Sequence, residues 1–121
     1  KFINDNYGHN IGDKLLKDVG TRIKDTVRKG DTVCRWGGDE FTFMLPSINN
    51  IDGIFSLCKR LLKNKMNDFI IDQNKISITA SIGIALFPQH GKTADKLINC
   101  ADKAMYKAKK GGKNNYYLFG S

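Results

Sequence analysis

The five residues Gly37–Phe41 have the types and the spacing to do chemistry: two glycines, an aspartate, a glutamate and a phenylalanine. They stand between two runs that predict strands, Thr32–Trp36 and Phe41–Leu45. The glycines permit the positive φ angles of a tight hairpin, so the carboxylates are expected at a bare turn that a large ligand can approach. Adjacent carboxylates repel each other unless a cation lies between them. The pattern predicts a magnesium site with Asp39 as the better ligand; an acidic turn without a ligand is the alternative.

A second polar cluster covers residues 4–13, where Asn4 precedes a predicted helix and Asp13 is expected in its first turn. A carboxylate accepts hydrogen bonds from N1–H and the exocyclic amine of guanine, and an amide donates to O6. The two side chains are therefore candidates to read a guanine edge. Helix capping explains the same residue types without any ligand.

Two basic clusters complete the set of candidates. Lys109 and Lys113 flank a pair of glycines at the end of a predicted helix, where they suit phosphates as point charges or merely satisfy the helix dipole. Arg28 and Asp31, spaced R-x-x-D, precede the hairpin. The arginine fork grips phosphate or guanine and the aspartate binds guanine or orients the arginine; a surface ion pair is the alternative.

The elements that must position these residues follow from hydrophobic periodicity. The sequence predicts helices over residues 13–28, Ile51–Met66 and Ala94–Lys109. Besides the hairpin, it predicts strands over Phe69–Ile71, Ile76–Leu86 and Asn115–Phe119. Helices over a mostly antiparallel sheet make an α/β sandwich. Because the chain opens in a loop that enters the first helix, we expect a strand before that helix to be missing.

Length and composition limit the number of domains, the kinds of partner and the cellular compartment. The 121 residues suffice for one domain with one core. The net charge of +8 suggests anionic partners, or simply a solvated basic face. The three cysteines, Cys34, Cys58 and Cys100, are odd in number and lack a C-x-x-C pair, which argues against zinc and for buried thiols in a reducing compartment. No run approaches membrane-spanning length and no signal peptide is visible.

Four blocks of residues, in order, resemble the GGDEF family of diguanylate cyclases. They are K-x-I-N-D-x-x-G-H-x-x-G-D at residues 1–13, R-W-G-G-D-E-F at 35–41, S-I-G-I-A at 81–85 and A-D-x-A-M-Y-x-A-K-x-x-G-K-N at 101–114. The likeness runs from Lys1 to Phe119, so the whole chain, 1–121, is expected to be one such domain, incomplete at its N-terminus. The family fold resembles the polymerase palm, a relative of the ferredoxin-like sandwich.

The resemblance implies an enzyme that joins two GTP molecules into cyclic di-GMP and releases two pyrophosphates, with Mg²⁺ or Mn²⁺ as cofactor. Two subunits would face each other as an antiparallel homodimer. It implies the following roles: Asn4 and Asp13 for guanine; Asp39 and Glu40 for metal; Arg35 for transition-state charge; Gly37 and Gly38 for passage of GTP; Phe41 as an anchor; Lys109 and Lys113 for the β and γ phosphates. Arg28 and Asp31 match a product-inhibition site, which Lys59, or else Arg60, would complete.

Three departures from the family pattern qualify these implications. The strand with D-x-D that precedes residue 1 in the family is absent, so the chain as given is expected to be nearly inactive. Lys113 stands where arginine is usual, and Trp36 stands where tyrosine or leucine is common. Such domains usually follow a sensor or receiver in a cytoplasmic protein, which is membrane-anchored in some cases.

Two other functions compete with catalysis. A GGDEF-like receptor would bind cyclic di-GMP or GTP without turnover, although the intact signature at Gly37–Phe41 favours the enzyme. A basic ferredoxin-like module would bind RNA, but the exposed aromatics of such a sheet are not evident in the sequence and the hairpin tip is acidic. We therefore expect no nucleic-acid partner.

Overall fold

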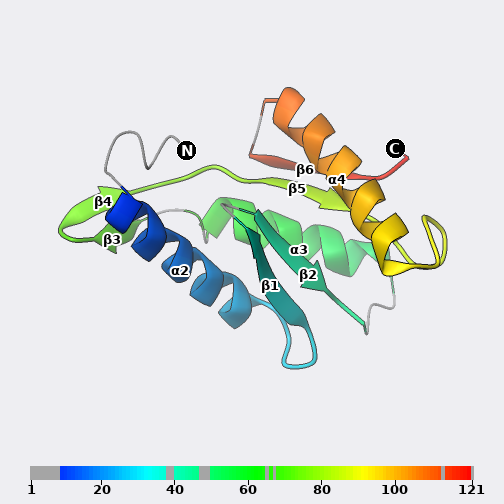
Figure 1. Cartoon of the computed structure of the whole chain (residues 1–121), viewed down its shortest axis with the longest axis horizontal. Helices are drawn as coiled ribbons and strands as arrows, with labels where there is room; N and C mark the ends of the chain where they lie inside the picture. Colours follow the sequence, from blue (N-terminus) through cyan, green and yellow to red (C-terminus); the bar gives the residue numbers. More distant parts are fainter. Residues whose placement is uncertain are drawn as a thin grey trace. The chain divides into compact units, whose positions relative to one another are not determined.

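The computed structural model of the chain describes residues 9–37, 40–46, 50–64, 66, 68–112 and 114–120 (Figure 1). The chain divides into two compact units, Lys1–Ile78 and Thr79–Ser121. Helices and short strands alternate in both, which confirms the predicted α/β class. No helix in the described ranges is long and apolar enough to cross a membrane.

Helix α2, His9–Thr26, begins four residues earlier than predicted and ends two residues earlier. The early start has a simple cause, because Ile11 lies one turn before Leu15 and continues the same apolar face. Leu15, Val19 and Ile23 are buried along that face. Asp13 consequently lies in the second turn of the helix and not, as predicted, in the first.

Strands β1, Thr32–Gly37, and β2, Glu40–Met44, form the predicted antiparallel hairpin. Pairing is regular from Thr32 opposite Met44 to Arg35 opposite Phe41, and then shifts by one residue so that Gly37 lies opposite Glu40. Such a shift is a β-bulge, which increases the local twist. The bulge therefore sits directly beside the segment that carries the candidate chemistry.

Helix α3, Ile51–Asn64, is preceded by Asn50, whose Oδ1 accepts hydrogen bonds from the backbone N–H groups of Asp52 at 2.8 Å and Gly53 at 3.4 Å. This is an N-cap, which satisfies donors that have no partner within the helix. The helix ends two residues before the predicted Met66, and its inward face is apolar. Its buried members are Ile54, Leu57, Cys58 and Leu61.

Cys58 and Cys100 are free and buried, as predicted; the side chain of Cys34 lies outside the described part. Burial raises the pKa of the Cys58 thiol from 9.0 to about 12, because the thiolate would lose its hydration. Below its ordinary pKa the thiol is neutral in both states. At higher pH the unfolded chain ionises first, so the stability contributed by the buried thiol is lost as pH rises from 9.0 towards 12.

We expect the free energy of unfolding to fall by about 1.4 kcal/mol per pH unit in this window because of Cys58 alone. The Cys58→Ala variant lacks this contribution although it is less stable near neutral pH. Urea unfolding followed by circular dichroism, in steps between about pH 8 and pH 10, measures the difference between the two slopes. Parallel slopes would show that the thiol is not protected by the fold.

Strands β3, Phe69–Ile71, and β4, Asn74–Ile76, form a second antiparallel hairpin. Asp72 and Gln73 connect them with positive φ angles of 48° and 73°, as in a type I′ turn. The hairpin rests on α2. Phe69 is 0% exposed and lies under the guanidinium of Arg22, 3.8 Å from the ring centroid.

The second unit consists of strand β5, Ser81–Ile84, helix α4, Ala94–Lys110, and strand β6, Asn115–Leu118. Strands β5 and β6 pair in parallel, which the sequence did not predict. A parallel pair needs a long crossover, and α4 supplies it. At Gly83, a Cβ atom would lie 1.9 Å from the carbonyl oxygen of Ala101 and 2.4 Å from the backbone nitrogen of Met105, so the strand packs directly on the helix backbone.

The predicted long strand Ile76–Leu86 is wrong. Strand β4 ends at Ile76 and β5 begins at Ser81, and residues 77–80 have no ladder partner among the described residues. The backbone N–H of Ile78 instead donates to the carbonyl of Met66 at 2.9 Å, in the segment after α3. Large and small residues alternate through this segment as they would in a strand, but its backbone does not form hydrogen bonds with a neighbouring strand among the described residues.

Candidate functional site

The hairpin β1–β2 contains the candidate catalytic and metal-binding residues that the sequence predicts. Arg35 lies opposite Phe41, and Gly37 lies opposite Glu40. Gly38 and Asp39 connect that last pair and fall outside the described residues, as do the side chains of Arg35 and Glu40. The register nevertheless confines the candidate metal ligands to the connection between β1 and β2 and the residue after it.

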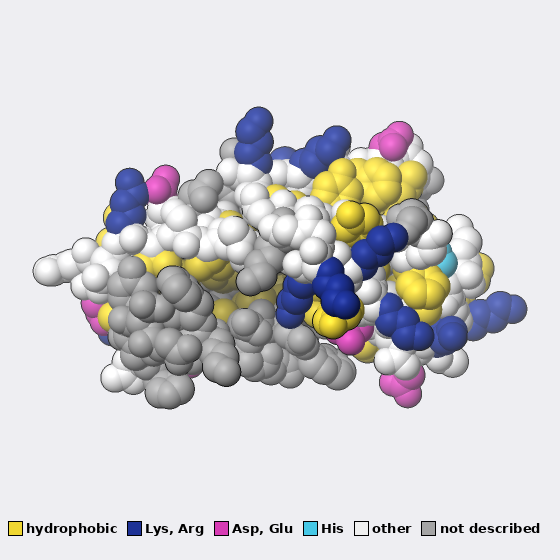
Figure 2. Space-filling view, turned by 90° about the horizontal axis from the view of Figure 1, so that it is seen from above, with side chains coloured by type: hydrophobic (Ala, Val, Ile, Leu, Met, Phe, Trp, Pro, Cys, Tyr) yellow, Lys and Arg dark blue, Asp and Glu magenta, His cyan; other side chains and the backbone are white. Residues whose placement is uncertain are grey.

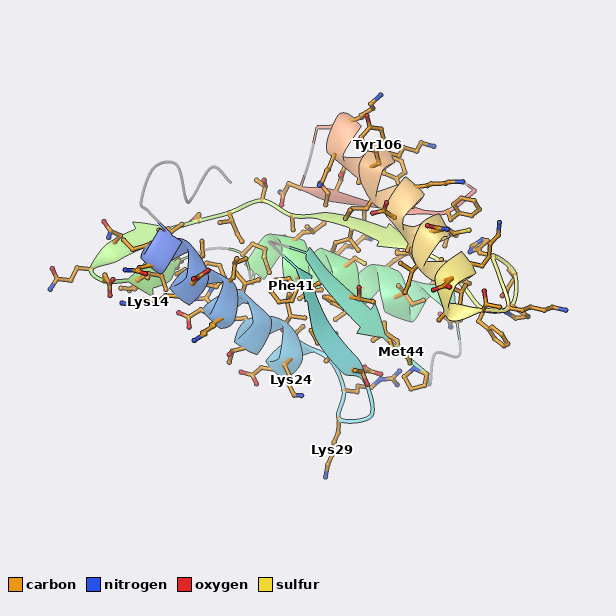
Figure 3. All side chains as sticks on the ribbon, in the orientation of Figure 1. Lys14, Lys24, Lys29, Phe41, Met44 and Tyr106 are labelled. Atoms are coloured by element: carbon orange, nitrogen blue, oxygen red, sulfur yellow. The ribbon has the colours of Figure 1, made fainter. Side chains whose placement is uncertain are left out.

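Phe41 ties this hairpin to helix α2 (Figure 3). A Cβ atom at Gly20 would lie 3.2 Å from Cε1 and 3.8 Å from Cζ of the Phe41 ring, so the ring reaches the helix where there is no side chain. The phenylalanine is half-buried. The residue that follows Glu40 is therefore held by packing on the same helix that carries Asp13.

Asp13 lies on the exposed face of α2, accessible to a ligand. Next to it, Nζ of Lys14 lies 2.9 Å from each carboxylate oxygen of Asp72 in the β3–β4 turn. Both partners are about half exposed, so the pair contributes little to stability. Asn4, the proposed partner of Asp13, lies outside the described residues.

A cavity of about 380 Å³ lies in the first unit, where the end of α2, the turn before β1 and helix α3 meet. It is lined by apolar side chains and by two arginines. The lining residues are Thr26, Val27, Arg28, Asp31, Leu45, Asn50, Gly53, Ser56, Leu57 and Arg60. Such a cavity suits a ligand with a flat apolar body and anionic groups.

Arg28 and Asp31 form a closed turn at this cavity. The backbone N–H of Asp31 donates to the Arg28 carbonyl at 2.9 Å, and the backbone N–H of Arg28 donates to Oδ2 of Asp31, also at 2.9 Å. The Asp31 side chain is 5% exposed, whereas that of Arg28 is 63% exposed, with its Nε 3.9 Å from Oδ2. Asp31 therefore orients the turn, and the exposed Arg28 guanidinium is the group accessible to a ligand.

Arg60, and not Lys59, lines the cavity. The prediction from the sequence names Lys59, with Arg60 as the alternative. Helical spacing separates them, because Gly53, Leu57 and Arg60 share one face of α3 whereas Lys59 lies off it. The same spacing also identifies Ser56, which the sequence argument missed.

Lys109 is exposed in the last turn of α4, and Lys113 lies outside the described residues. The backbone N–H of Gly111 donates to the Lys107 carbonyl at 2.9 Å and ends the helix. Gly112 then takes a φ of 109°, which favours glycine. The two glycines turn the chain between the two candidate phosphate-binding lysines.

In the part of the chain that the structure describes, no three His, Cys, Asp or Glu side chains converge on a point that would hold a metal ion. Asp39 and the side chain of Glu40 lie outside that part. Their carboxylate oxygens suit Mg²⁺ by type. The donor set is therefore compatible with the metal proposed from the sequence.

The sequence matches the family described as the diguanylate cyclase GGDEF domain over residues 1–115. It is 43% identical to MucR of Pseudomonas aeruginosa, named a bifunctional diguanylate cyclase/cyclic di-GMP phosphodiesterase, over 121 residues: 100% of this chain and 18% of that protein. It is 35% identical to NbdA of the same organism, named a cyclic di-GMP phosphodiesterase, over 119 residues: 98% of this chain and 15% of that protein. The chain thus spans less than a fifth of either relative.

Among solved structures, an EAL/GGDEF domain protein from M. capsulatus matches with a TM-score of 0.91 and 42% identity, over 98% of this chain and 77% of that one. The agreement in structure confirms the predicted palm-like α/β fold.

Proposed function

Because the chain belongs to the GGDEF domain family of diguanylate cyclases, we propose that it condenses two GTP molecules into cyclic di-GMP. The observation that supports the proposal is the β1–β2 register, in which Gly37 and Glu40 of the signature lie opposite each other, beside a bulge and on either side of a two-residue connection. Each 3′-hydroxyl oxygen forms a bond to the α-phosphorus of the other GTP, and pyrophosphate leaves as the bond from that phosphorus to the bridging oxygen breaks. Two copies of the domain must therefore face each other.

The roles proposed for the side chains follow from position and chemistry. Asp13 is an exposed carboxylate on α2, suited to guanine together with Asn4. Lys109 and Lys113 hold phosphates as point charges. Phe41, packed against Gly20, fixes the hairpin under the nucleotide. Positioning of this kind supplies much of the rate in phosphoryl transfer.

Charge in the transition state is balanced at the hairpin. Mg²⁺ or Mn²⁺ bound by Asp39 and Glu40 would neutralise phosphate oxygens and stabilise the developing charge. Glu40 either completes that site or takes the proton of the attacking hydroxyl. Arg35 offsets charge on the leaving pyrophosphate.

We also propose that the cavity between the Arg28–Asp31 turn and α3 binds the product and inhibits the enzyme. Leu45, Leu57 and Val27 provide apolar walls for a guanine base. Arg28 and Arg60 provide forks for phosphate or for the guanine edge. The apolar walls and the two arginines thus suit the bases and the phosphates of cyclic di-GMP.

Replacing Arg28 by alanine should weaken cyclic di-GMP binding about twentyfold or more, because a charged hydrogen bond to the ligand is lost. Isothermal titration calorimetry measures the change. Lys29→Ala, in the same turn, serves as the control and should leave the affinity within about threefold. Equal effects of the two substitutions would mean that only net charge matters.

Arg60 and Lys59 offer a matched pair on α3. Arg60→Ala should cost at least about tenfold in the same titration, since Arg60 lines the cavity. Lys59→Ala should change the affinity by less than about threefold. The reverse result would restore Lys59 as the third member of the product site.

The experiment that tests the proposed reaction is incubation with GTP and Mg²⁺, followed by chromatography for cyclic di-GMP and pyrophosphate. Both the chain itself and a version extended by a preceding family strand should be assayed. A receptor without activity remains the second candidate, favoured by the arginine-lined cavity. Tight cyclic di-GMP binding with no product from either version would select the receptor.

We further propose that the domain works in the cytoplasm, where GTP is available, and that an upstream sensor or receiver in the parent protein controls how the two copies meet. The match to a small part of each long relative supports a role as one module among several.

A further inference from the structure

Helix α4 carries a row of lysines that the proposed reaction does not use. Lys96, Lys103, Lys107 and Lys110 are all exposed. At 3.6 residues per turn they fall within an arc of about 60°, and at 1.5 Å per residue they span about 21 Å. We name these four residues the lysine face. Lys109, assigned to GTP phosphates, points about a third of a turn away.

The lysine face is not explained by the helix itself. Basic residues in the last turn interact favourably with the helix dipole, which accounts for Lys107 and Lys110. Lys96 lies in the first turn, where a positive charge is unfavourable, and Lys103 lies in the middle. Among the described residues, Lys96, Lys103 and Lys110 form no ion pair with a carboxylate. The two aspartates of the helix, Asp95 and Asp102, stand roughly 100° away.

The surroundings of the lysine face are partly apolar. Tyr106, the residue before Lys107, is 59% exposed, and elsewhere in the same unit Phe87 is 67% exposed. Figure 2 shows Lys and Arg side chains interspersed with hydrophobic patches on the face seen from above. Lysine stems and aromatic rings together are typical of protein surfaces that rest on the headgroup region of a bilayer.

From these observations we propose that the lysine face docks on an anionic phospholipid surface. The unit Thr79–Ser121 contains seven lysines and no arginine, which suits attraction to a diffuse negative surface better than forked recognition of single phosphates. Nucleic acid fits less well. Lys110 lies 4.9 Å above the ring of Tyr106, and Lys107 lies 5.1 Å from the ring centroid of Tyr117, so a lysine already occupies a face of each ring on which a base would stack.

The test is cosedimentation of the chain with vesicles of phosphatidylcholine that contain about one-third phosphatidylglycerol, at low and at raised salt. Each lysine contributes about fivefold to such binding. The variant with Lys96, Lys103, Lys107 and Lys110 changed to glutamine should therefore bind at least about fiftyfold more weakly. The control changes Lys17, Lys24, Lys29 and Lys75 to glutamine, all exposed in the first unit, and should lose less than about fivefold.

Three results would overturn the proposal. They are equal losses in the two variants, no binding of the unmodified chain to the anionic vesicles, and tighter binding to a single-stranded RNA that disappears in the lysine-face variant. Circular dichroism melting shows whether each variant folds. The double variant Lys96→Gln/Lys103→Gln leaves the last turn unchanged and, should the fourfold variant unfold, must still lose at least about tenfold. Lys109 and Lys113 are retained throughout, so failure here is separable from failure of the cyclase proposal.

Discussion

Replacing Asp39 by asparagine should lower the formation of cyclic di-GMP by on the order of a thousandfold, the largest effect on activity expected for this chain. Asparagine keeps the size and removes the charge that a divalent cation requires. The substitution lies in the connection between Gly37 and Glu40, the last pair of the hairpin. Product chromatography from GTP and Mg²⁺, in a version of the chain that turns over, measures the rate.

The matched control for Asp39→Asn is Asp25→Asn, which makes the same change on the exposed face of α2. It should retain activity within about twofold. Both variants should still bind cyclic di-GMP at the cavity between the Arg28–Asp31 turn and α3. Retained binding shows that the protein is folded, so a loss of activity is then a loss of catalysis. Undiminished turnover in Asp39→Asn would remove the proposed metal site from the mechanism.

Replacing Gly83 by alanine should be the most damaging small change to stability. A Cβ atom there would lie within 2.4 Å of backbone atoms of both Ala101 and Met105, and a helix backbone cannot rotate aside as a side chain can. Strand β5 and helix α4 would have to separate. We expect a loss of about 3 kcal/mol or more in the free energy of unfolding, at the upper end for overpacking.

Gly53→Ala makes the same chemical change but is expected to raise the free energy of unfolding. Nothing lies within 4 Å of a Cβ atom at Gly53 on α3, and alanine favours a helix by about 0.5–1 kcal/mol over glycine. Urea unfolding gives the overall stability, and amide hydrogen exchange within residues 79–121 locates the change. Exchange rates in Gly83→Ala that match those of the unmodified chain would show that β5 and α4 accommodate the methyl group.

Local signals in the sequence predicted the hairpins well. Two glycines and two carboxylates between β-rich runs gave β1–β2 nearly to the residue, and Phe69–Ile71 has the predicted bounds. The bulge before Gly37 was not predictable, because it depends on how the two strands twist against each other. The parallel pairing of β5 with β6 was missed because side chains alternate in the same way in parallel and antiparallel ladders.

The candidate site was predictable by residue type more than by arrangement. The R-x-x-D spacing pointed to Arg28 and Asp31 but not to their different roles, which depend on burial: the Asp31 carboxylate is enclosed and the Arg28 guanidinium is exposed. The choice between Lys59 and Arg60 depended on which face of α3 meets the turn. Neighbouring residues on a helix differ by about 100° in direction, so composition alone cannot decide between them.

The turn at Arg28–Asp31 has a consequence for how its motif can vary. Its two hydrogen bonds run in opposite directions between the same two residues and close a ring of fixed size. One residue more or fewer between them would break both bonds at once. Residues 29 and 30 can therefore vary in type but not in number. The closed turn fixes the backbone from which Arg28 extends, so a ligand binds without the cost of ordering this loop.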